Sequence, residues 1–76
     1  MAGEDLNIGF YLDEIVTRLT DATAIAKAAV ACAEAGSTRE ALRIVLDLDE
    51  ILSETTTLHS ALILAGRLQR NAKGAA

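Results

Sequence analysis

The chain has 76 residues, of which 51% are hydrophobic and only 3% aromatic, and its formal net charge is -4. A chain of this length forms one domain at most, near the lower limit of what a single hydrophobic core stabilises alone. Cys32 is the only cysteine, which excludes a disulfide within the chain. An acidic chain repels the phosphate backbone, so nucleic acid is not expected as a partner.

Small domains of this kind usually add disulfides, a bound metal or a partner chain. The sequence has no cluster of histidines and cysteines, and no Glu-x-x-His pair for a carboxylate-bridged metal site. We therefore expect no metal and no cofactor. Self-association, as a homodimer or a larger assembly, is the remaining route to stability.

The composition also bears on where the protein is found. A lone cysteine fits a reducing compartment, and the acidic segment 1–5 lacks the basic start of a signal peptide. The longest uncharged run, residues 55–66, is shorter than the roughly 18–20 apolar residues that span a bilayer. We expect a cytoplasmic protein that does not enter the membrane.

The first predicted element is a helix over about residues 6–35. Asp5 and Asn7 are both suitable N-caps, and Gly36 suits a left-handed cap at the other end. No proline interrupts the chain, and alanine and leucine favour a helix. Residues 36–37 are expected to form a tight turn.

The second predicted element is a helix over about residues 38–71, followed by a fraying tail over 72–76. Ser37 and Glu40 have the spacing of a capping box at its start. A turn this short makes two long helices antiparallel neighbours. The predicted fold is all-α: a long helical hairpin in one domain, which dimerises into a four-helix bundle.

Apolar residues in both predicted helices recur at alternating spacings of three and four, which predicts a heptad seam between them. In the first helix the seam is Ile8, Leu12, Ile15, Leu19, Ala22, Ala26, Ala29 and Ala33. In the second it is Ala41, Ile44, Leu48, Ile51, Thr55, Leu58, Leu62, Ala65 and Gln69. Folding the chain at the turn places small residues opposite large ones, for example Ala29 opposite Ile44.

Many apolar residues remain outside this seam, and two helices do not cover so wide a surface on each other. Large uncovered patches usually mark an interface. The residues predicted to form one are Val16, Ile25, Val30, Leu42, Leu46, Ile63 and Leu64.

Few residues suggest chemistry. His59 is the only histidine; a pH-sensitive pair or a phospho-acceptor is conceivable, but a boundary histidine bonded to a neighbour is the preferred interpretation. Cys32 lies near a helix C-terminus, which disfavours a thiolate, so we interpret it as a small buried residue. An enzyme would need a composite site, and the best candidate is Tyr11, Glu14 and His59. We predict that the protein is not an enzyme.

Charged residues gather at two places in the second helix. Asp47, Asp49, Glu50 and Glu54 crowd its middle and are interpreted as a solvated face that steers a basic partner. Arg67 and Arg70, with Lys73, lie near its C-terminal end, where they complement the helix dipole. Brought together from two chains, these basic residues give an alternative hypothesis of nucleic-acid binding.

The segment from Ala31 to Leu42 resembles the turn of a tetratricopeptide hairpin, but the predicted helices are about twice as long as in that repeat. The two-helix architecture resembles small bacterial dimeric hairpin regulators of the Rop type, without a shared motif. Taken together, the sequence predicts a small homo-oligomeric module for protein–protein interaction, such as a regulatory adaptor or inhibitor.

Overall fold

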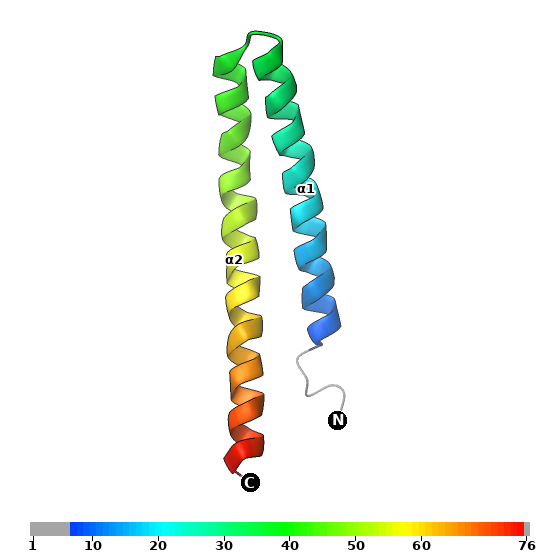
Figure 1. Ribbon diagram of the computed structural model, residues 1–76, viewed down its shortest axis with the longest axis vertical. Coiled ribbons are helices and arrows are strands. Elements are labelled where there is room, and N and C mark those ends of the chain that lie inside the picture. Colours follow the sequence, from blue (N-terminus) through cyan, green and yellow to red (C-terminus); the bar gives the residue numbers. More distant parts are fainter. Residues whose placement is uncertain (1–6, 76) are drawn as a thin grey trace.

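The computed structural model describes residues 7–75, which form two helices, α1 (Ile8–Glu34) and α2 (Thr38–Ala75). The helices run antiparallel and side by side, joined at one end by a short turn (Figure 1). The resulting rod measures 61 × 18 × 13 Å. The predicted all-α hairpin is therefore confirmed. Across the described residues, neither helix has an apolar stretch long enough for a membrane span.

Helix α1 begins at an asparagine cap. Asn7 adopts the left-handed region, with φ 50° and ψ 55°, which asparagine tolerates better than most residues. Its Oδ1 accepts a hydrogen bond from the backbone N–H of Phe10 at 3.3 Å. Asn7 is thus the N-cap, as one of the two expected alternatives; the other, Asp5, lies outside the described residues.

The turn satisfies the carbonyls that α1 leaves unpaired at its end. Gly36 has a φ of 89°, and its N–H donates to the carbonyl of Ala33 at 3.0 Å. The N–H of Ser37 donates to the carbonyl of Cys32 at 2.9 Å, which completes a Schellman motif. The carbonyl of Ser37 then accepts from Ala41 at 3.0 Å and starts α2.

Helix α2 continues to Ala75, beyond residue 71, where the sequence suggested that it would end. Ala72 and Lys73 are good helix formers, and no proline follows them. A single glycine at position 74 lowers local helix stability without ending the helix. This end of α2 projects past the first turn of α1 (Figure 1).

The seam on α2 matches the expected one. From Ala41 to Ala65, every expected seam residue is buried or half-buried; only Gln69, at the end, is exposed. Helix α1 is different: Ile8, Ile15, Ala22 and Ala29 are in the seam as expected. The other four expected residues are not, since Leu12 and Leu19 are about half exposed and Ala26 and Ala33 are exposed. The other half of the seam consists of Tyr11, Arg18, Ile25 and Cys32.

The core between the helices is thin. The buried hydrophobic residues in the described part of the chain are Ala22, Ala29, Ala41 and Ala65, and none of its large side chains is fully buried. Contacts across the seam agree with the expected register, since Tyr11 borders the same hollow as Leu62 and Ala65. Small residues therefore bring the backbones together, and most of the leucine, isoleucine and valine surface is left outside.

Candidate interaction surface

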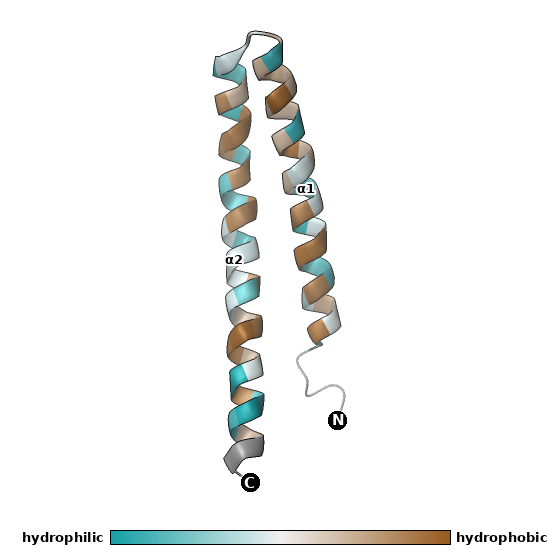
Figure 2. Cartoon of the chain, in the orientation of Figure 1, coloured by the Kyte–Doolittle hydropathy of each residue, from teal (hydrophilic) through white to brown (hydrophobic). Residues whose placement is uncertain are grey.

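Exposed hydrophobic side chains are the dominant feature of the surface. Among residues 7–72, thirteen large ones are between 37% and 71% exposed, with members on both helices. They are Phe10, Tyr11, Leu12, Val16, Leu19, Val30, Leu42, Val45, Leu46, Leu52, Ile63, Leu64 and Leu68. Figure 2 shows hydrophobic positions all along both helices, not only where the two meet.

On α1, four of the exposed hydrophobic residues lie in one regular stripe. Leu12, Val16, Leu19 and Val30 are all exposed, and Thr23 and Ala26 occupy the positions between them. The successive spacings are 4, 3, 4, 3 and 4, so these residues lie along one side of the helix. The stripe runs beside the seam for most of the length of α1.

A matching stripe on α2 contains Val45, Leu52 and Ile63, and the polar residues Asp49, Thr56 and His59 occupy the positions between them. Leu52 directly follows seam residue Ile51, as Leu19 directly follows seam residue Arg18. In an antiparallel pair, residues displaced from the seam in the same rotational sense lie on the same face. The two stripes thus share one side of the hairpin.

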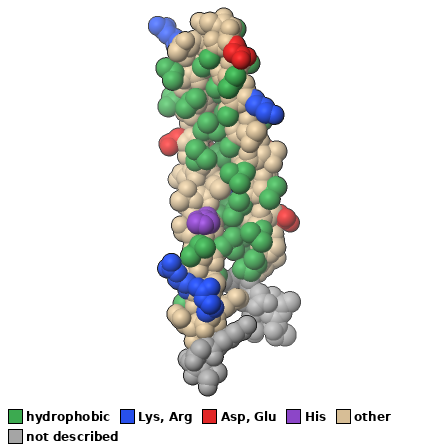
Figure 3. Space-filling view, in the orientation of Figure 1, with side chains coloured by type: hydrophobic (Ala, Val, Ile, Leu, Met, Phe, Trp, Pro, Cys, Tyr) green, Lys and Arg blue, Asp and Glu red, His purple; other side chains and the backbone are tan. Residues whose placement is uncertain are grey.

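We call this side the apolar face and define it by Leu12, Val16, Leu19, Val30, Val45, Leu52 and Ile63. Figure 3 shows the face: hydrophobic side chains form a band over both helices, and the histidine lies within it on α2. Acidic side chains stand only at the margins of this view, and basic ones gather near the C-terminal end of α2.

The opposite side of the hairpin carries charge. Glu14 and Glu54 are each two residues from an apolar-face leucine or valine, which places them about 200° away around their helices. Arg18 joins them: its guanidinium donates to Glu14 at 2.6 Å and, across the two helices, to Glu54 at 3.1 Å. Both hydrogen bonds raise the pKa of Arg18, and the one to Glu14 has the larger effect.

Five of the remaining predicted charges are solvent-facing, and the side chain of Lys73 lies outside the described part of the structure. Asp47, Asp49 and Glu50 are exposed along the middle of α2. Arg67 and Arg70 are exposed near its end. Arg43 lies 3.6 Å from Glu40, a pair within the same helix. Exposed pairs of this kind contribute little to stability, so these charges influence chiefly what approaches the surface.

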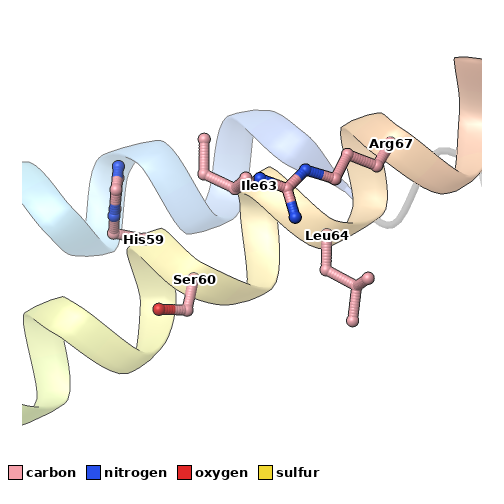
Figure 4. A pocket seen from close by; sticks show the side chains of 5 residues that line it. All are labelled: His59, Ser60, Ile63, Leu64 and Arg67. Atoms are coloured by element: carbon pink, nitrogen blue, oxygen red, sulfur yellow. The ribbon is translucent and has the colours of Figure 1, made fainter.

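The predicted interface residues do not share one face. Val16, Val30 and Ile63 belong to the apolar face, whereas Ile25 is half-buried in the seam beside Ala22 and Ala29. Leu64 points away from Ile63, to the other side of α2 (Figure 4). Leu42 and Leu46 are exposed. Leu46 precedes Leu64 by 18 residues, which is five full turns, so both lie on the same side of α2. We call this the outer side of α2.

Leu12 and Leu19, which the sequence pattern placed in the seam, also line the apolar face, together with Val45 and Leu52. Their heptad spacing was visible in the sequence. What the pattern left open was which of two adjacent apolar stripes on α1 would meet α2.

His59 is exposed and borders a shallow hollow of about 260 Å³ with Ser60, Ile63, Leu64 and Arg67 (Figure 4). All five residues are on α2. The composite site with Tyr11 and Glu14 is not assembled here, since the Glu14 carboxylate binds Arg18 and Tyr11 borders a different hollow.

Cys32, expected to be buried, is half-buried near the end of α1. Across the described residues, no group of three or more histidine, cysteine, aspartate or glutamate side chains is arranged to hold a metal ion. Comparison with protein families, with curated proteins and with solved structures found no match to this chain.

Proposed function

We propose that the protein is a small, non-enzymatic module for protein–protein interaction, a regulatory adaptor or inhibitor, which acts as a homo-oligomer. The observation that carries this proposal is the exposure of thirteen large hydrophobic side chains around a core of alanines. Contiguous apolar patches beyond a few hundred Å² are rare on monomers and mark interaction sites.

The weak core supports the same proposal. A helical hairpin of this length buries only Ala22, Ala29, Ala41 and Ala65 among its described residues. Helices are stabilised mainly by packing an apolar face, and alanine supplies little apolar area. Association with further helices would add the leucine, isoleucine and valine contacts that the single hairpin does not make.

The charged surface supports a role in recognition. Asp47, Asp49 and Glu50, together with Glu54, give α2 an exposed acidic segment that would attract a basic partner. Cys32, as a lone thiol, suits the cytoplasm, which is where we place this interaction.

Molar mass in solution tests the homo-oligomeric part of the proposal. Size-exclusion chromatography with light scattering, repeated over a wide range of protein concentrations, is expected to give at least twice the 8.0 kDa mass of the chain. A mass of one chain at every concentration would overturn self-association. The exposed surface would then have to be covered by a different protein.

Nucleic-acid binding is a second candidate, and it rests on Arg67 and Arg70, both exposed near the end of α2. The net charge of -4 opposes it. Fluorescence anisotropy of labelled single- and double-stranded RNA and DNA, titrated at low and then rising salt, decides the question. Absence of binding at low salt would remove this candidate.

A further inference from the structure

We propose that a second copy of this chain covers the apolar face, so that two hairpins pack face to face as a four-helix bundle. This inference rests on the proposed self-association and goes further by naming the surface that is buried. It assigns Leu12, Leu19 and Leu52 to the interface and places Leu46 and Leu64 outside it.

The pattern of apolar positions favours a bundle. In a two-helix pair each helix needs only its seam, whereas a helix in a four-helix bundle has a third apolar position beside the seam. Leu12 and Leu19 supply that position on α1, and Val45 and Leu52 supply it on α2. Both third positions lie on the same side of the hairpin, so the additional helices must approach from that side.

The size of the face matches a stable dimer. Helix α1 has 27 residues and is therefore about 40 Å long, and the hairpin is 18 Å wide. A projected area of roughly 700 Å² is close to the ~800 Å² that each partner buries in a standard specific interface. Its accessible area is larger, because side chains stand out from the plane.

The chemistry of the face also fits a second copy. From Leu12 to Val30 the α1 stripe contains leucine, valine, threonine and alanine, with no charge for a partner of opposite sign to match. An identical hairpin offers the same uncharged stripe over the same length. Two such faces related by a two-fold axis would bury the uncharged α1 stripes of both chains, and two-fold symmetry is the usual solution for soluble homodimers.

The opposite side then remains outside. Glu14, Arg18 and Glu54 form a hydrogen-bonded group there that two packed hairpins would leave in water. Burying these charges against another hydrophobic surface would carry a large desolvation penalty. This hydrogen-bonded group thus favours the apolar face over the opposite side for packing.

The test compares two leucines on α2 that differ in which side they occupy. Leu52 is 49% exposed on the apolar face, and Leu64 is 55% exposed on the outer side. Alanine at either position preserves the helix, because alanine has the highest helix propensity. The dimer dissociation constants of the wild type, Leu52→Ala and Leu64→Ala are measured by sedimentation equilibrium, with circular dichroism confirming helicity.

We expect Leu52→Ala to raise the dissociation constant at least tenfold, because a dimer loses the side chain twice, and Leu64→Ala to change it less than threefold. Leu19→Ala, on α1, is expected to behave like Leu52→Ala. A wild type that is monomeric throughout would overturn both this inference and the proposed self-association. A dimer weakened by Leu64→Ala, or unaffected by Leu52→Ala and Leu19→Ala, would overturn only the assignment of the face.

Discussion

Gly36 sets the geometry of the turn, since its φ of 89° lies where a side chain is strained. The N–H groups of Gly36 and Ser37 reach back to the carbonyls of Ala33 and Cys32 only in this conformation. A Cβ at Gly36 would meet no neighbouring atom, so any cost of adding one comes from the backbone and not from a clash.

Replacing Gly36 therefore tests the turn. Gly36→Ala should lower the free energy of unfolding by about 1 kcal/mol, and Gly36→Asn by less, because asparagine tolerates the left-handed region. Urea unfolding at one fixed protein concentration measures both. Equal losses for the two variants would argue against backbone strain as the cause.

Thr55 is the one polar residue in the middle of the α2 seam. It is half-buried, and its hydroxyl donates to the carbonyl of Ile51 at 2.7 Å, which is the back-bond that its place in the seam leads one to expect. Thr57 makes a similar bond to Ser53 at 3.1 Å but is exposed. The two threonines differ mainly in burial.

This difference predicts a difference in stability. Thr55→Val should raise the free energy of unfolding by about 1 kcal/mol, because a methyl group replaces a hydroxyl inside an apolar seam. Thr57→Val should change it by less than about 0.5 kcal/mol, as is usual at exposed sites. The same urea titration compares them, and a loss of stability in Thr55→Val would contradict this account of the seam.

At the scale of the helices, alanines control how closely α1 and α2 approach. Ala22 and Ala29 on α1 and Ala41 and Ala65 on α2 are the buried residues of the seam. Small side chains at these positions let larger ones such as Ile44 and Ile51 pack against the opposing backbone. Ala28, next to Ala29 in sequence, is exposed.

Enlarging the two neighbouring alanines should have different effects. Ala29→Leu is expected to lower the free energy of unfolding by about 1–3 kcal/mol, because it overfills the seam and forces the helices apart. Ala28→Leu should stay within about 0.5 kcal/mol of the wild type. Thermal unfolding of both variants checks this, and the same effect from each would show that Ala29 does not limit the approach.

The sequence predicted the elements well because their determinants are local. Heptad spacing, the glycine at position 36 and the asparagine at position 7 set where helices begin, end and turn. The α2 seam was also predictable, since that helix has one best apolar line. On α1, Leu12 and Leu19 compete with Tyr11 and Arg18 for the same role, and hydrophobicity alone chooses the leucines.

Contacts between the helices place Tyr11 and Arg18 in the seam instead of Leu12 and Leu19. Arg18 reaches both Glu14 and Glu54, so its charged end remains in water while its stem lies along the seam. Leu12 and Leu19 turn outward with Val16 and Val30. No pattern within α1 contains this information, because it depends on which residues of α2 lie opposite.

For the whole molecule, the outward turn of Leu12 and Leu19 gathers most of the exposed apolar stripe on one side, while the ion pairs of Arg18 with Glu14 and Glu54 lie on the opposite side. The predicted interface included Leu46 and Leu64, since exposure on a single helix does not show which direction a neighbour occupies. Once α1 and α2 are placed together, Val16, Val30 and Ile63 fall on one face. A candidate interaction surface thus becomes definable only from the hairpin.

We expect this hairpin to be stable chiefly when a second copy covers its apolar face. Thermal unfolding followed by circular dichroism over a hundredfold range of protein concentration tests it directly. If folding and dimerisation are coupled, the midpoint should rise by about 5 °C or more across that range. A midpoint that does not move with concentration would contradict the claim and show that the hairpin folds by itself.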